Sequence, residues 1–316
     1  MLGARSCVRN VGLENPRRID VSMLKERVRR EISITLRLNI NNIWVAMFPA
    51  VVFAAAGWVS NGSSSATEAL KFLAALVWSY FFSYVFDAAN QAVGCEEDVL
   101  NKPHRPIPHG LVDSRGLWAR YRWASALFVA VSLVGNATTL AASLGWVLVT
   151  LFAHTQLKPR HYYLWKPVTT WLGVVAQLAG GWSFMDDLAS ESIMWIVVVA
   201  TMFIVAQPIE DVRDIAGDTR MGKVSLAYLF GAKKVCVAFC LIIAAWPFLA
   251  YALFLHSSTL SPWEWGALLL LGALCGIAFH HAYQWNSLHH QRRAYIVYCF
   301  AYIALTLVPL SCLVSR

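Results

Sequence analysis

NQAVGCEEDVLNKPHRPIP, residues 90–108, is where a long apolar segment ends in carboxylates that are followed at once by basic residues. A second apolar segment ends in the same way at residues 210–223, EDVRDIAGDTRMGK. Carboxylates this close together repel one another, and acidic side chains beside a bilayer are costly unless a cation neutralises them. Both stretches are therefore expected to meet a cation at a membrane surface.

The polar positions of each stretch share one helical face, within an arc of about 100° at roughly 100° of rotation per residue. They are Asp87, Asn90, Gly94, Glu97 and Asp98 in the first, and Glu210, Asp211, Asp214 and Asp218 in the second. Carboxylate and amide oxygens suit Mg²⁺, which bridges protein carboxylates to the phosphate oxygens of a substrate. Basic residues just downstream would meet the remaining phosphate charge, namely Lys102, Arg105, Arg213, Arg220 and Lys223. We infer a site that binds a diphosphate through Mg²⁺.

The composition of the whole chain predicts its fold class. Of its 316 residues, 58% are hydrophobic and 14% are charged, and the mean hydropathy is +0.52. A soluble core could not absorb so much apolar sequence, so we expect an all-α polytopic membrane protein. About nine segments are long enough to cross a bilayer as helices of roughly 20 residues. They lie near residues 40–60, 68–93, 117–135, 137–154, 163–184, 193–207, 234–254, 263–282 and 294–313.

The distribution of basic residues predicts the orientation, because cytoplasmic loops collect lysine and arginine. All of the 26 basic residues except Lys71 and Arg316 fall in the N-terminal arm, in the loops after spans two, four, six and eight, or at the span ends that border them. The N-terminus and both acidic stretches are therefore expected on the cytoplasmic face, in the endoplasmic reticulum or a similar endomembrane if the source is eukaryotic. The net charge of +8 reflects topology and contact with anionic lipids, not nucleic-acid binding.

Two regions are expected along the chain. Residues 1–37 form a basic cytoplasmic arm without the apolar run of a signal peptide, and residues 21–36 within it are expected to form an amphipathic helix. Residues 38–316 form the transmembrane domain, with small cap regions near residues 95–116 and 208–233. Pro208, directly after the sixth span, is expected to bend the second acidic stretch over the membrane. The seven cysteines show no spacing that indicates disulfides or zinc.

The order of residues in the two stretches is similar to that of a known family. N-Q-x2-G-x3-D-x2-N-K-P-x-R-P-I-P, followed later by E-D-x2-D-x3-D-x3-G-K, resembles the UbiA superfamily of intramembrane prenyltransferases. The usual first motif of that family is N-x3-D-x3-D, and the second is a D-x3-D type. The resemblance extends to Leu157 and Lys158 in an intervening loop and to the number of helices, so it covers most of the chain beyond the arm.

One position departs from the family pattern, since Gly94 stands where the middle aspartate of the first motif is expected. Glu97 lies within about 20° of Asn90 on a helical wheel and could replace the missing ligand. A first motif of the N-x3-G-x3-D kind resembles the branch of membrane-bound terpene cyclases in this superfamily.

The residues and the resemblance together predict a set of site residues. The predicted Mg²⁺ ligands, which are also the predicted catalytic residues, are Asn90, Glu97, Asp98, Asp211, Asp214 and Asp218. The predicted diphosphate-binding residues are Lys102, Arg105, Lys158, Arg160 and Lys223. For Lys158 and Arg160, a purely topological positive charge is the alternative. Tyr80 and Tyr84 are predicted to line a pocket for the prenyl chain and its carbocation, with ordinary interhelical packing as the alternative.

The chemistry that fits such a site is Mg²⁺-assisted ionisation of an allylic prenyl diphosphate, because no activated nucleophile is evident. We favour intramolecular cyclisation of a farnesyl or geranylgeranyl chain to a terpene, on the evidence of Gly94 and the many aromatic residues. Transfer of the prenyl group to an aromatic or other acceptor is the alternative. A transporter or lipid-binding protein without catalysis is a third hypothesis. The expected partners are the prenyl diphosphate and the lipid bilayer, and no obligate protein partner is evident.

Overall fold

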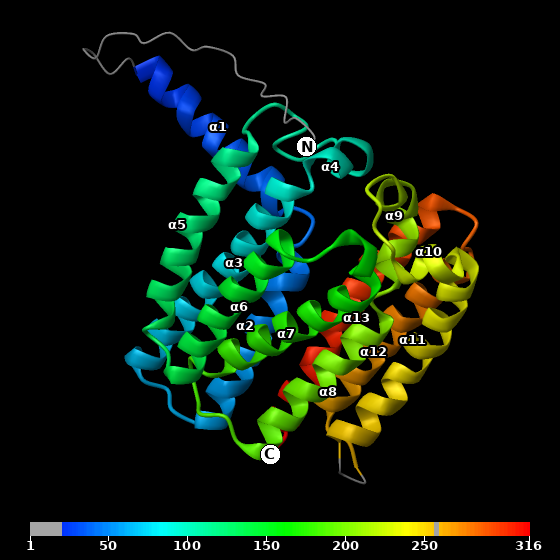
Figure 1. The fold of residues 1–316 in the computed structure, drawn as a ribbon. Coiled ribbons are helices and arrows are strands. Elements are labelled where there is room, and N and C mark those ends of the chain that lie inside the picture. Colours follow the sequence, from blue (N-terminus) through cyan, green and yellow to red (C-terminus); the bar gives the residue numbers. More distant parts are fainter. Residues whose placement is uncertain (1–20, 256–258) are drawn as a thin grey trace.

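The structure is a computed structural model that describes residues 21–255 and 259–316. Every regular element within these residues is a helix (Figure 1). The α-helices are α1 (Val21–Asn39), α2 (Ile43–Asn61), α3 (Ala66–Val93), α4 (Cys95–Asn101), α5 (Ser114–Ser132), α6 (Ala137–Thr155), α7 (Tyr162–Trp182), α8 (Ser190–Ala206), α9 (Ile209–Arg220), α10 (Leu226–Phe230), α11 (Ala232–Phe254), α12 (Pro262–Tyr283) and α13 (Leu288–Val314). A single 3₁₀ turn, η1 (Pro159–His161), precedes α7.

Each predicted span corresponds to a helix of the structure. These helices are α2, α3, α5, α6, α7, α8, α11, α12 and α13. Among the described residues, six helices are long and apolar enough to cross a membrane, and the bent pair of α8 and α9 adds a seventh. α5 falls short because it carries Arg115, Arg120 and Arg122, and α7 because Lys166 and Gln177, together with its tyrosine, tryptophan and glycine residues, lower its mean hydropathy. The all-α membrane fold is confirmed, and nine is an approximate number of spans.

Small and polar residues fix the centre of the bundle, where α2 packs between α7 and α13. A Cβ atom added at Gly181 of α7 would lie 2.3 Å from the carbonyl oxygen of Ala50 in α2, so the two backbones touch. The buried side chain of Gln177 accepts a hydrogen bond of 3.0 Å from the Tyr302 hydroxyl of α13. Close backbone approach and interhelical hydrogen bonds of this kind hold helices together within a bilayer.

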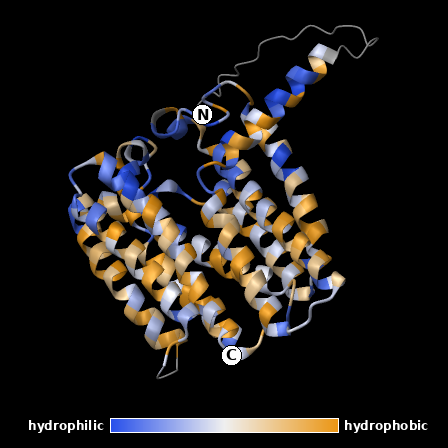
Figure 2. Ribbon diagram, turned by 180° about the vertical axis from the view of Figure 1, so that it is seen from behind, coloured by the Kyte–Doolittle hydropathy of each residue, from blue (hydrophilic) through white to orange (hydrophobic). Residues whose placement is uncertain are grey.

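Two breaks in the helices place both acidic stretches at one end of the bundle. Gly94 separates α3 from α4, and Gln207–Pro208 separates α8 from α9 with a bend of 49°. The bend expected at Pro208 is thus confirmed. α4 and α9 lie at the end opposite to the C-terminus (Figure 1), and hydrophilic residues gather around them (Figure 2).

The helix predicted over residues 21–36 is α1, which runs on to Asn39 and projects beyond the bundle (Figure 1). Its C-terminal half is tied to the loop after α4. Arg30 donates to the carbonyl oxygen of Leu111, and Arg37 donates to that of His104 at 2.9 Å. Residues 1–20 of the predicted arm lie outside the described residues.

Candidate active site

The helices α4 and α9 pack against each other because one residue of α9 has no side chain. A Cβ atom added at Gly217 of α9 would lie 2.1 Å from Nδ2 of Asn101, the last residue of α4. Any larger residue at position 217 would separate the two helices or displace Asn101. This contact brings together the two acidic stretches that the sequence singled out.

Two lysines join the two stretches through ion pairs. Lys223 donates to Glu97, which lies 126 residues earlier in the chain, and its Nζ atom is 3.7 Å from a carboxylate oxygen of Asp218. Lys102 Nζ lies 3.7 Å from a carboxylate oxygen of Asp214. Glu97 and Lys102 belong to the first stretch, and the other three residues belong to the second. The two stretches therefore form one cluster of opposite charges at one end of the bundle.

Asp98 is almost fully buried beside an arginine. Both of its carboxylate oxygens accept hydrogen bonds from Arg105 Nη1, at 2.7 and 2.9 Å. Burial raises the pKa of Asp98, although the positive charges of Arg105 and Lys102 act in the opposite direction. Arg105 Nε is also buried and has no acceptor among the described residues. An anionic oxygen entering the cluster could accept a hydrogen bond from this nitrogen.

Lys166 is a half-buried cation of the cluster that was not among the predicted site residues. Its Nζ atom lies 2.5 Å from a carboxylate oxygen of Asp211 and 3.0 Å from one of Glu210. It also lies 5.3 Å from the centre of the Tyr162 ring, as does Nζ of Lys223. The available signal was its position, since Lys166 is the one charged residue within the fifth predicted span, and ionisable residues in spans are functional candidates.

Aromatic rings enclose the second acidic stretch from two sides. Tyr162 begins α7 and faces the two lysines. On the other side, the guanidinium of Arg213 lies 3.9 Å from the centre of the Tyr295 ring in α13, and its nitrogens are within 3.6 Å of oxygens of Glu210 and Asp214. The tyrosines could not be placed from sequence, because their neighbours come from distant helices.

Three of the predicted site residues have weaker links to the cluster. Asn90 is half-buried in the last turn of α3, and no described contact joins its side chain to a carboxylate. Lys158 and Arg160 are exposed, and no ion pair of either occurs among the described residues. Their loop is nevertheless held beside the second stretch, because the Val224 amide donates to the carbonyl oxygen of Pro159 at 3.1 Å. Coordination of Mg²⁺ by Asn90 and binding of diphosphate by Lys158 and Arg160 stay predictions.

Tyr80 and Tyr84 lie near each other in α3, with ring centres 5.9 Å apart and ring planes tilted by 51°. The hydroxyl of Tyr84 accepts a hydrogen bond of 3.4 Å from Arg120 of α5, which is also paired with Glu31 of α1. Tyr84 is thus linked to α5, and among the described residues no ring contact or hydrogen bond joins either tyrosine to a carboxylate of the acidic cluster. Lining of a carbocation pocket by the two rings stays a prediction.

The donor atoms of the cluster fit Mg²⁺, since they are carboxylate oxygens contributed by two neighbouring helices. In the described part of the chain, no three acidic, histidine or cysteine side chains lie close enough to share one ion. Lysine ammonium groups stand between the carboxylates instead, as Lys223 does between Glu97 and Asp218. Glu97, Asp98, Asp211, Asp214 and Asp218 could hold the metal once their lysine and arginine pairs open.

The model of the UbiA prenyltransferase family matches residues 44–306 of this chain. The chain belongs to the UbiA prenyltransferase family. Somaliensene A/B synthase of Streptomyces somaliensis is 32% identical over 221 residues, which cover 70% of this chain and 73% of the relative. Two proteins of Hericium erinaceus, named diterpene cyclase eriG and polyprenyl transferase eriF, are each 24% identical over 278 residues, or 87% of this chain, and the match covers 87% and 93% of their lengths.

The fold of this UbiA-family chain also resembles solved structures. A UbiA homolog from Archaeoglobus fulgidus bound to DMAPP and Mg²⁺ superposes with a TM-score of 0.56 at 14% sequence identity, over 87% of this chain and 99% of that one. The predicted family is therefore confirmed, and so is the placement of the chain among integral membrane proteins. Relatives that are named for cyclisation and for transfer both occur among the similar UbiA-family proteins.

Proposed function

We propose that this UbiA-family protein ionises an allylic prenyl diphosphate and cyclises the prenyl chain to a terpene. The observation that carries the proposal is the 32% identity to a protein named as a somaliensene synthase. Gly94 supports cyclisation, because a first motif with glycine in place of the middle aspartate resembles that of the terpene cyclase branch. The cluster of carboxylates and lysines between α4 and α9 supports diphosphate binding in either reaction.

The residues of the cluster have separate roles in this proposal. Mg²⁺, when bound, acts as a Lewis acid on the leaving diphosphate. Lys102, Arg105, Lys166 and Lys223 donate hydrogen bonds to the diphosphate oxygens as negative charge develops on them. The C–O bond breaks and the diphosphate leaves with the electron pair. A double bond of the same prenyl chain then attacks the allylic cation, and loss of a proton gives a cyclic hydrocarbon.

The apolar bundle protects the cation from water, which would otherwise convert it to an alcohol. Tyr80 and Tyr84 are the aromatic residues that we propose for this pocket, since π faces attract cations. Lys158 and Arg160 are proposed to approach the diphosphate from the loop before α7. We also propose that the cluster faces the cytoplasm, because the basic residues concentrate at its end of the bundle.

Prenyl transfer to an acceptor is the second candidate, because a relative of equal similarity to the diterpene cyclase is named as a polyprenyl transferase. The test is incubation of the purified, reconstituted protein with Mg²⁺ and geranylgeranyl or farnesyl diphosphate alone. We expect a cyclic hydrocarbon, detected by mass spectrometry of the organic extract. Turnover that begins only when an aromatic or other acceptor is added would assign transfer instead.

Loss-of-function variants link this reaction to the cluster. Asp98→Ala and Asp211→Ala should each abolish product formation. Glu96→Gln is the matched control, because Glu96 is exposed on α4 beside the cluster and forms no ion pair within the described residues. Activity that survives in both aspartate variants would show that the cluster is not the site of ionisation.

A further inference from the structure

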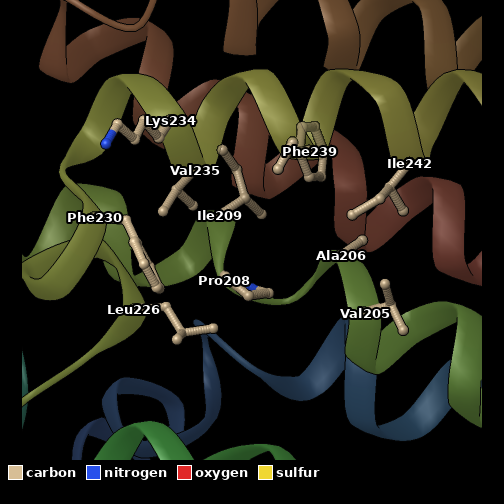
Figure 3. Close-up of a pocket in the computed structure, with 11 residues that line it drawn as sticks. Val205, Ala206, Pro208, Ile209, Leu226, Phe230, Lys234, Val235, Phe239 and Ile242 are labelled. Carbon is tan, nitrogen blue, oxygen red and sulfur yellow. The ribbon is translucent and has the colours of Figure 1, made fainter.

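An apolar groove lies on the membrane-facing side of the bend between α8 and α9. Its volume is about 350 Å³, and α8, α9, α10 and α11 all contribute to it. Its walls include Val205, which is 50% exposed, and Phe230, which is 57% exposed. Ten of its lining residues are drawn with labels in Figure 3, and among the eleven that line it the single polar one is Lys234. The groove is therefore open to the lipid phase along most of its length.

We propose that this groove binds an anionic phospholipid, with one acyl chain in the groove and the phosphate at Lys234. Lys234 lies at one end and Ile242 and Val205 lie at the other (Figure 3). Eight residues of helix separate Lys234 from Ile242, which is about 12 Å along α11. Lys234 sits near the start of α11, at the end of the bundle that carries the hydrophilic residues. The groove thus runs from the membrane surface toward its centre, as an acyl chain does.

The charge of Lys234 favours an anionic headgroup. Its side chain is exposed, and no ion pair or hydrogen bond of Lys234 occurs within residues 21–255 and 259–316. The neighbouring Lys233 differs, because its ammonium lies 5.9 Å from the centre of the Trp285 ring. Basic residues at a membrane surface attract anionic lipids, and each contributes about fivefold to binding.

The groove is not the continuation of the diphosphate site, because the two lie on opposite faces of α9. At roughly 100° per residue, Asp211, Asp214 and Asp218 all lie about 140° or more from Ile209, which lines the groove. A prenyl chain whose diphosphate is held by these aspartates would have to pass around the helix to enter it. A phospholipid can enter directly from the bilayer. Its acyl chain would brace the bend that positions the second acidic stretch.

Native mass spectrometry of the purified full chain tests the proposal without reference to catalysis. Delipidated protein is mixed with phosphatidylglycerol or with phosphatidylcholine, and retained lipid is counted. Wild type should keep one phosphatidylglycerol, and Lys234→Gln should keep it about fivefold less well. Lys233→Gln, the matched charge control, should behave as wild type. Ala238→Trp, which fills the groove from an exposed position, should lose the lipid, whereas Leu241→Trp, 71% exposed on the same helix outside the groove, should keep it.

Several outcomes would overturn the proposal. Equal retention of the two lipids by wild type would show that the groove does not select an anionic headgroup. Unchanged retention in both Lys234→Gln and Ala238→Trp would place any bound lipid elsewhere. Displacement of the lipid by geranylgeranyl diphosphate would show that the groove is part of the substrate site. If wild type forms a dimer without lipid and Ala238→Trp is monomeric, the groove is an interface between two copies of the chain.

Discussion

Replacement of Lys166 by methionine tests whether internal ion pairs neutralise the acidic cluster before any ligand binds. The side chain of Lys166 is 15% exposed and lies 2.5 Å from Asp211 and 3.0 Å from Glu210. In the variant, Glu210 keeps Arg213 at 3.6 Å, whereas no other ion pair of Asp211 occurs among the described residues. Removal of one partner of a buried pair costs about 3–5 kcal/mol, and the remaining arginine favours the lower end, about 3 kcal/mol.

The expected loss is measurable as a shift in apparent melting temperature. At roughly 1.5 °C per kcal/mol for a chain of 316 residues, Lys166→Met should melt about 4–5 °C below wild type in a chelator. Lys71→Met is the matched control, since Lys71 pairs with Glu68 three residues away at 3.1 Å and the two side chains are 32% and 10% exposed. Because water can reach the half-buried position of Lys71, the loss of this pair should cost only about 1 kcal/mol.

Addition of Mg²⁺ separates this explanation from general damage to the fold. The cation can neutralise the carboxylates that Lys166 leaves behind, so Mg²⁺ should raise the melting temperature of Lys166→Met more than that of wild type. It should not rescue Lys71→Met. The reasoning fails if Lys166→Met and Lys71→Met lose the same stability, or if Mg²⁺ leaves the melting temperature of Lys166→Met unchanged.

Three further predictions follow from the same contacts. If Glu97 replaces the missing aspartate, Glu97→Gln should raise the Mg²⁺ concentration needed for half-maximal turnover, whereas Glu96→Gln should not. The same Mg²⁺ requirement in both variants would reject this role of Glu97. Gly217→Val should lower turnover at least tenfold by separating α4 from α9. Addition of Asn101→Ala to this variant should restore part of the turnover, because the second substitution removes the atom that lies 2.1 Å from the added Cβ. Additive effects of the two substitutions would show that the two positions do not interact. Removal of divalent cations with a chelator should abolish product formation reversibly, and product that continues to form would exclude the proposed chemistry.

The sequence was sufficient to predict the helices and the two acidic stretches, because hydropathy and charge are local properties. Pro208 was visible as the point where the sixth apolar segment ends, and α9 begins directly after it. The single helical face drawn through Gly94 was wrong, because α3 ends at Val93 and a separate helix, α4, begins at Cys95. The partners of the carboxylates were not predictable in the same way. Lys166 was overlooked because its partner Asp211 lies 45 residues away on another helix. The contact of Gly217 with α4 was not predictable either, because Asn101 lies on a separate helix.

The pairing of lysines with carboxylates has a consequence for how ligands bind. In the structure, Lys102, Lys166 and Lys223 neutralise carboxylates of α4 and α9. Mg²⁺ alone would have to displace these lysines and leave their charges unpaired, and a diphosphate alone would have to draw them away from the carboxylates. When both enter together, the carboxylates can turn to the metal and the lysines to the phosphate, so no charge is left without a partner. Calorimetry should therefore show weak binding of Mg²⁺ or of a non-ionisable prenyl diphosphate analogue alone, and at least tenfold tighter binding of each in the presence of the other. Tight binding of either one alone would mean that the lysine pairs do not have to open, and that the cluster is organised differently in solution.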